Sequence, residues 1–302
     1  MKSAHKHVKP CRNWRNNSVT THKSHSIGVI VPQIVSTFFA TVVKTIEEVA
    51  DGHGYNVLVI SSNESFQKEQ KSVEVLMANR ADGIILALSH ETKDYEHIKM
   101  IQESGTPIVL FDRTTNELNA SRVVTDGVTA AFQAVQHLVS EGCKKIALLC
   151  GPENVAIGGN RMEGDEKAMD LPAKTELIWH CSDFTVEAGK EATRQLLSRQ
   201  ERPDAIFGIT DDLAIGAIEA IKEKGLNIPE DIAVVGFSNT KRSRYMNPTV
   251  SSINQFPEKI GRAAAELLFD QILNSKHAQI KKEIINCELI VRESSERLCK
   301  TR

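Results

Sequence analysis

The sequence has no long apolar run and no paired cysteines, and these absences exclude several classes of protein. No stretch of the chain approaches the roughly 18 apolar residues of a membrane span. No apolar segment follows the basic N-terminus, as one would in a secretory signal. The six cysteines are scattered and form no CxxC pair, so neither a disulfide framework nor a zinc site is expected. We therefore expect a cytoplasmic protein that binds no metal and contacts no membrane.

The common motifs of catalysis and cofactor binding are missing as well. There is no GxGxxG loop after the first apolar run, no GxxxxGK(S/T) loop, no HExxH and no GxSxG. His90 and His180 are the histidines nearest to expected strand ends. No acid accompanies either at a fixed spacing, so each is interpreted as a surface or sheet-face residue. We expect no catalytic residue and no cofactor, although a sugar- or nucleotide-processing enzyme remains an alternative.

The net charge of −2 is unevenly distributed along the chain. Residues 1–25 contain no acidic residue, so the rest of the chain is distinctly acidic. A basic N-terminal segment before an acidic chain indicates a tail or linker near DNA, or a solvated end. The basic residues of this segment are Lys2, Lys6, Lys9, Arg12, Arg15 and Lys23.

From Ser26 onward, short β-branched apolar runs alternate with longer amphipathic segments. Near-continuous apolar runs are typical of strands covered on both faces, and strands that alternate with helices indicate parallel sheets. The expected strands are Ile27–Val31, Asn56–Ile60, Gly83–Ala87, Pro107–Phe111, Lys145–Leu149, Glu176–His180, Ala205–Gly208 and Ile232–Val235. The expected helices are Phe39–Asp51, Gln67–Ala78, Thr129–Ser140, Thr185–Leu197 and Leu213–Glu223.

The strand–helix pattern starts twice. Ser26–Pro32 (SIGVIVP) and Lys145–Pro152 (KIALLCGP) each predict a strand, then a proline, a polar loop and a helix. There are also too many strands for one open sheet. The predicted fold class is therefore α/β, with two similar doubly wound parallel-sheet lobes. Ligands of such sheets bind beyond the carboxyl ends of the strands, so two facing lobes form a cleft.

Polar and aromatic residues follow the expected strands and are the candidates for lining this cleft. Carboxylates hydrogen-bond hydroxyl groups with directionality, and aromatic rings stack on the face of a sugar or base. Structural alternatives stay open: Asp211 as a helix N-cap, a phenylalanine in the core, and an Asp112–Arg113 ion pair that closes a loop. The candidates are Phe38, Phe39, Asp112, Arg161, Phe184, Thr210, Asp211 and Ser238.

At these residues the sequence resembles the lac repressor/galactose repressor family of bacterial transcription regulators. The resemblance extends over residues 26–296, and several matching stretches are long and occur in the family's order. The longest are Arg202–Ile221 (RPDAIFGITDDLAIGAIEAI) and Asn227–Asn239 (NIPEDIAVVGFSN). The others are Ser26–Pro32, Ala81–Ile85 (ADGII), Pro107–Arg113 (PIVLFDR), Gly151–Arg161, Pro248–Gln255 (PTVSSINQ) and Glu288–Ser295 (ELIVRESS).

The resemblance implies a core like that of type I periplasmic binding proteins. Its two lobes would be joined by three crossover segments, near Thr125, Ile253 and Cys287. It also implies a homodimer that binds a small polar effector in the cleft. The lobes would comprise residues 26–125 with 254–287 and residues 126–253 with 288–302, after a basic tail or degenerate hinge remnant at residues 1–25.

The resemblance also implies roles for individual residues. Arg161 matches the family's effector-anchoring arginine, and Phe184 matches its stacking aromatic. Ser238 stands where the family often has an acid. A sugar or sugar derivative is the family's commonest effector, although such departures leave the effector's identity open. The positions at or beside the family's effector pocket are Phe38, Phe39, Asp112, Arg161, Phe184, Asp211 and Gln255.

Family members begin with a helical DNA-binding head and a hinge helix that enters the minor groove. Here 25 residues precede the core, and Cys11–His22 fits the hinge pattern poorly. We expect no sequence-specific DNA binding by this chain, and operator DNA as a partner only if the intact protein has a head. The leading interpretation is the ligand-sensing, dimerising core of a transcription regulator. A solute-binding protein without a DNA role is the second.

Overall fold

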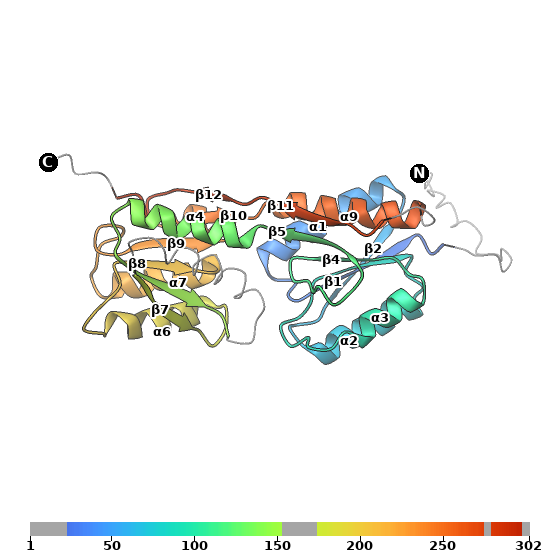
Figure 1. The fold of residues 1–302 in the computed structure, drawn as a ribbon, viewed down its shortest axis with the longest axis horizontal. Coiled ribbons are helices and arrows are strands. Elements are labelled where there is room, and N and C mark those ends of the chain that lie inside the picture. The colour runs from blue at the N-terminus through green and yellow to red at the C-terminus, as the bar shows by residue number, and fades with distance from the viewer. Residues whose placement is uncertain (1–22, 153–173, 275–278, 298–302) are drawn as a thin grey trace, which may run out of the picture.

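The chain forms two lobes that lie side by side in the computed structural model (Figure 1). Each lobe is built on a six-stranded sheet with helices packed against it. The structure describes residues 23–152, 174–274 and 279–297. This architecture confirms the predicted α/β class with two doubly wound lobes.

The first lobe contains a parallel sheet with strand order β11-β5-β4-β3-β1-β2. Successive residues of a strand point to opposite faces. Val29 accordingly packs with helices α1 and α9 on one face, whereas Ile30 packs with α2 and α3 on the other. The elements are β1 Ser26–Val31, α1 Thr37–Gly52, β2 Asn56–Ser61, α2 Phe66–Ala78, β3 Gly83–Leu86, α3 Glu96–Glu103, β4 Ile108–Phe111, β5 Ser121–Thr125, α9 Pro257–Leu273 and β11 Lys282–Ile285.

The second lobe has strand order β12-β10-β9-β8-β6-β7, and only the β10–β12 pair among its described strand pairs is antiparallel. Helix α4 packs against β8, β10 and β12, whereas α7 packs against β8, β9 and helix α6. The elements are α4 Gly127–Ser140, β6 Lys145–Cys150, β7 Lys174–His180, α6 Val186–Leu197, β8 Ala205–Gly208, α7 Asp211–Glu223, β9 Ala233–Phe237, α8 Lys241–Tyr245, β10 Ser251–Asn254 and β12 Glu288–Ile290.

Three connections carry the chain between the lobes. The first joins β5 to α4, the second joins β10 to α9, and the third joins β11 to β12 (Figure 1). The crossovers predicted near Thr125, Ile253 and Cys287 lie at these three places. The residue ranges assigned above to the two lobes remain our proposal.

Each predicted strand, and each predicted helix that falls within the described residues, is present with ends that shift slightly. The helix predicted after Lys145–Pro152 lies outside the described residues. The prediction omitted helices α3, α8 and α9 and strands β5, β10, β11 and β12. The omitted strands are short, and none forms a continuous apolar run in the sequence. Strand β11 (KEII), for example, is largely exposed. Their place in the sheets depends on the crossovers, which bring distant segments together.

Helices α6 and α7 pack so closely that their contact requires glycine. A Cβ atom added to Gly216 of α7 would lie 2.1 Å from the carbonyl oxygen of Val186, and one added to Gly189 of α6 would lie 2.4 Å from that of Leu213. Backbone atoms cannot yield as a flexible side chain does. The two backbones therefore approach each other at these two positions.

We predict that Gly216→Ala lowers the free energy of unfolding by about 1–3 kcal/mol, because overpacking against backbone outweighs the gain in helix propensity. Gly52→Ala is the matched control, since Gly52 is also helical and an added Cβ would meet nothing within 4 Å. The control is expected to be neutral or stabilised by up to about 1 kcal/mol. Urea denaturation measures both variants. Equal stability of the two would contradict the close helix contact.

Candidate functional site

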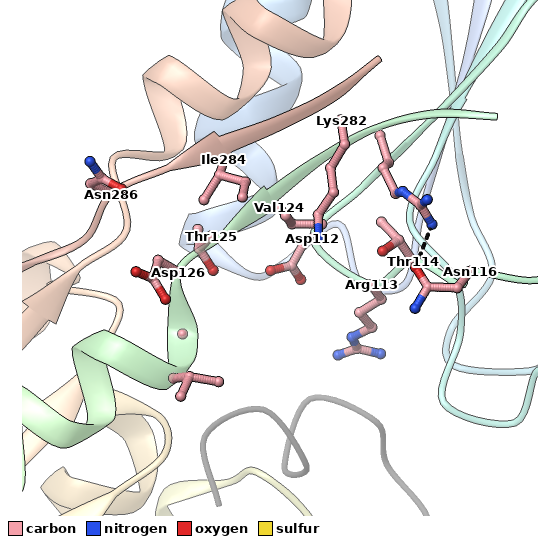
Figure 2. Close-up of a pocket in the computed structure, with 13 residues that line it drawn as sticks. Asp112, Arg113, Thr114, Asn116, Val124, Thr125, Asp126, Lys282, Ile284 and Asn286 are labelled. Atoms are coloured by element: carbon pink, nitrogen blue, oxygen red, sulfur yellow. Dashed lines mark hydrogen bonds between the residues drawn. The ribbon is translucent and has the colours of Figure 1, made fainter. Parts of the chain in front are cut away.

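A cavity of about 600 Å³ lies at the junction of the lobes. Its walls come from the turn after β4, from strand β5 and the connection to α4, and from β11 and the residue after it (Figure 2). The carboxyl ends of three strands of the first sheet therefore meet here, as expected for a ligand site of a parallel sheet. A second cavity of about 280 Å³ shares Asp126 and Asn286 with it and reaches α4. The ligand space thus adjoins two of the three crossovers.

Asp112 is the residue of the predicted site that lines this cavity. It follows β4 directly, and its backbone NH donates to the carbonyl of Val123 on β5 at 3.0 Å. Its φ of 56° lies in the left-handed region, which aspartate tolerates better than most residues. The turn therefore presents a carboxylate at the cavity wall in Figure 2.

Arg113, the next residue, is held by Glu64 from the loop after β2. Its Nη1 donates to Glu64 Oε2 at 2.5 Å, and His90 donates its backbone NH to the same oxygen at 3.1 Å. Burial opposes ionisation of Glu64, but the charge and hydrogen bonds of Arg113 outweigh it and lower the pKa of this carboxyl. The suggested Asp112–Arg113 ion pair is corrected: the partner of Arg113 is Glu64.

Phe38 and Phe39 begin α1, beside the same turn. Phe39 is only 5% exposed and belongs to the core, where its ring meets that of Phe111 edge-on at 6.1 Å. The guanidinium of Arg113 lies 5.9 Å from the Phe39 ring centroid. Phe38 is half-buried and packs against the same core. Phe39 thus supports the Asp112–Arg113 turn from beneath.

Ser238 and Gln255 are brought together from β9 and from the second crossover. The Ser238 hydroxyl donates to Gln255 Oε1 at 2.9 Å. Gln255 is 2% exposed, and its Nε2 has no hydrogen-bond partner among the described residues. A buried amide without an acceptor is costly, so this group suits a ligand or a bound water.

Thr210 and Asp211 stand at the start of α7. Thr210 is the N-cap, and its side chain accepts from the NH of Leu213. Asp211 is 1% exposed, and its carboxylate accepts from Ser252 Oγ and from the NH and hydroxyl of Thr240. Burial raises the pKa of Asp211, and these hydrogen bonds act against the rise. The structure therefore favours a structural role for Asp211, as a bridge between α7, α8 and β10.

Two predicted residues remain, Phe184 and Arg161. Phe184 is half-buried and lies over Gly151, where an added Cβ would come within 2.2 Å of its ring. Arg161 lies outside the described residues and stays a prediction. Among the described members of the predicted set, Asp112 alone lines either cavity.

Cys143 and Cys181 are buried, and the two histidines nearest to strand ends have polar partners. Burial raises the pKa of both Cys143 and Cys181 to about 12, so these thiols are protonated at neutral pH. His90 contacts Glu64, and His180 Nδ1 lies 3.3 Å from the Gly151 carbonyl oxygen. Residues 23–152, 174–274 and 279–297 contain no cluster of three potential metal ligands and no helix long and apolar enough to cross a membrane.

The prediction missed the wall formed by β5 and β11. Arg122 and Val124 on β5 and Lys282 and Ile284 on β11 line the cavity. The SRVVT segment of β5 is β-branched and precedes an Asp-Gly pair, which is a readable strand-and-turn signal. No comparable signal marks β11.

Comparisons with known proteins agree with this fold. Residues 24–293 match the family described as periplasmic binding proteins and sugar binding domain of LacI family. The HTH-type transcriptional repressor CytR of Escherichia coli (strain K12) is 33% identical over 93% of this chain and 82% of its own length. A transcriptional regulator CelR–cellobiose complex has a TM-score of 0.82 at 26% identity, covering 90% of this chain and 85% of that one. A LacI family regulator from Enterococcus faecium with bound ribose has a TM-score of 0.79 at 26% identity, covering 90% and 99%.

The fold and the junction cavity define a two-lobed effector-binding protein. The chain belongs to the LacI family of transcription regulators and comprises its effector-binding region, as the resemblance implied.

We predict that Asp211→Ala lowers the free energy of unfolding by roughly 2–4 kcal/mol, because it leaves buried donors of Thr240 and Ser252 without an acceptor. Asp212→Ala is the control, since the Asp212 side chain is 53% exposed and forms only a long contact with Arg242. The control is expected to change stability by less than about 0.5 kcal/mol. Thermal unfolding distinguishes the two, and a neutral Asp211→Ala would refute the bridging role.

We predict that Glu64→Gln destabilises the protein by about 1–2 kcal/mol near neutral pH, since the ion pair with Arg113 is lost. The pKa of Glu64 is lowered from its ordinary value of 4.5 in the folded state. Its contribution is therefore complete above that value and disappears as pH falls through the lower folded pKa. Urea denaturation should show the difference from wild type shrinking as the pH falls below the ordinary glutamate value. A difference independent of pH would show that the charge of Glu64 does not matter.

Proposed function

We propose that the chain binds a small polyhydroxylated effector, a sugar or sugar derivative, in the junction cavity, and that Asp112 hydrogen-bonds its hydroxyl groups. The observation that carries this proposal is the composition of the cavity wall. Asp112 faces a space whose other walls include residues 125–128 and Asn286, which belong to the crossovers. A ligand held there touches both a strand-end carboxylate and the hinge of the two lobes.

An effector bound at this position would be able to change the angle between the two lobes. A ligand shifts a conformational equilibrium only through contacts that differ between the two states. Contacts to the crossovers differ when the lobes change their angle, because the crossovers are the segments about which the lobes turn. Effector binding would therefore favour one angle between the lobes. In an intact homodimeric regulator that angle would position the DNA-binding heads on operator DNA.

The relatives support the same reading. The E. coli relative is named a transcriptional repressor, and the two structural relatives were solved with cellobiose and with ribose. We propose a cytoplasmic regulator that releases its ligand unchanged, as expected for a relative of a transcriptional repressor. Arg161 and Phe184, from the other lobe, would complete the effector contacts.

A solute-binding protein is the second candidate, because the family description also names periplasmic binding proteins. The same cavity would serve it. Effector-dependent pull-down of operator DNA by the intact protein separates the two functions, and its failure with the head present favours the solute-binding protein.

The test is Asp112→Asn, which keeps the shape and the left-handed backbone but removes the charge. A thermal-shift screen of pentoses, hexoses and disaccharides identifies a ligand, and calorimetry then measures its affinity. We expect Asp112→Asn to weaken binding by about tenfold or more, because a hydrogen bond to a charged acceptor is lost. Asp51→Asn, at the exposed end of α1, is the control and should bind as wild type does. If Asp112→Asn binds the ligand with unchanged affinity, the ligand does not hydrogen-bond Asp112.

A further inference from the structure

Strands β5 and β11 present an unusual surface to the cavity. Arg122 is the register partner of Lys282, and Val124 is the partner of Ile284. All four residues line the cavity, on the face of the sheet opposite to Val123, which is buried in the core with α1 and α9. The wall is therefore a pair of cations followed by a pair of aliphatic side chains.

Two like charges directly opposite each other on neighbouring strands destabilise a sheet unless an anion lies near them. In the part of the chain that the structure describes, neither Arg122 nor Lys282 forms an ion pair. Arg122 donates from Nη1 to the Thr115 carbonyl and to Asn116 Oδ1, both at 2.7 Å. These acceptors fix the guanidinium without neutralising it. Its Nε is buried and has no partner among the described residues.

Arg113 adds a third cation to the same wall. Its side chain is 10% exposed, its charge is balanced by Glu64, and its Nε is also buried without a described partner. Figure 2 shows Arg113 and Asn116 at one end of the cavity and Asp126 and Asn286 at the other. The cavity thus combines three cations, which share a wall with the Asp112 carboxylate, with an end at Asp126 and Asn286 that suits hydroxyl donors.

We propose that Arg122 and Lys282 form an anion-binding subsite, so that the effector is an anionic carbohydrate with a phosphate or carboxylate group beside its hydroxyls. This inference rests on the proposed function, because it names the class of ligand for the same cavity. The planar guanidinium and the ammonium donate charge-assisted hydrogen bonds to such a group. The aliphatic pair Val124 and Ile284 covers the carbon skeleton, and Asp112 accepts from its hydroxyls.

The test compares matched ligands that differ in charge. Calorimetry at constant ionic strength measures D-ribose against D-ribose 5-phosphate, and D-glucose against D-glucose 6-phosphate and D-glucuronate. Wild type should bind at least one anionic member about tenfold or more tightly than its neutral counterpart. The phosphate and carboxylate arms show which anion the subsite prefers.

Lys282→Gln is the main variant, because Lys282 makes no described hydrogen bond whose loss would disturb the fold. We expect it to reduce the ratio of anionic to neutral ligand affinity by about threefold to tenfold. The double variant Arg122→Gln/Lys282→Gln should bind anionic and neutral ligands equally. Lys281→Gln is the control: it removes the same charge one residue away, where Lys281 pairs with Asp270, and should leave both affinities unchanged.

Three other outcomes would contradict the anion-binding subsite, and one of them would also contradict the proposed function. Neutral sugars that bind wild type as tightly as their anionic counterparts overturn the subsite and leave the proposed function standing. A preference that survives in the double variant also overturns the subsite. Failure of every carbohydrate, neutral or anionic, to bind wild type overturns the proposed function and the subsite together.

Discussion

Parallel pairing of the strands is the constraint on which the rest of this structure depends. It places the carboxyl ends of β4, β5 and β11 at one edge of the first sheet, so Asp112, Thr125 and Asn286 meet although they lie far apart in the sequence. The chain leaves the lobe from two of these ends. The edge that gathers polar side chains is therefore also the edge from which the crossovers start, and ligand site and hinge share the same residues.

The cavity is held in shape by interactions that do not themselves need a ligand. Glu64 fixes Arg113, Phe39 packs beneath the turn, and Arg122 fixes the loop that carries Asn116. In the other lobe, Asp211 ties α7 to α8 and β10 and so sets where Ser238 lies. Such preorganisation reduces the entropy that a ligand must overcome on binding.

The fold was readable from the sequence because its central strands are continuous apolar runs. Val29 and Ile30 of β1 are both fully buried on opposite faces, and this double burial produces the run that predicts a parallel strand. Strand β11 has no such run, since KEII is mostly exposed. Its position beside β5 depends on parallel pairing with Arg122–Thr125 and on the buried Ile285, which no local pattern encodes.

The site was only partly predictable for the same reason. Asp112 follows an evident strand, and its predicted place at a cavity wall agrees with the structure, whereas Lys282 belongs to the unpredicted β11. The partner of Arg113 is Glu64, 49 positions away, so sequence proximity suggested Asp112 instead. Asp211 looked like a ligand contact or a cap, and only the packing of α8 and β10 around it shows its bridging bonds. Arg161 and Phe184 depend on the family resemblance.

We infer that the ligand lies at the lobe junction, between Asp112 and the β5–β11 wall. The most direct measurement is a crystal structure of this chain with the tightest-binding carbohydrate of the panel. We expect the ligand's hydroxyls within hydrogen-bond distance of the Asp112 carboxylate and the ligand in contact with Val124 or Ile284. A carbohydrate bound anywhere else, with this cavity left to water, would contradict it.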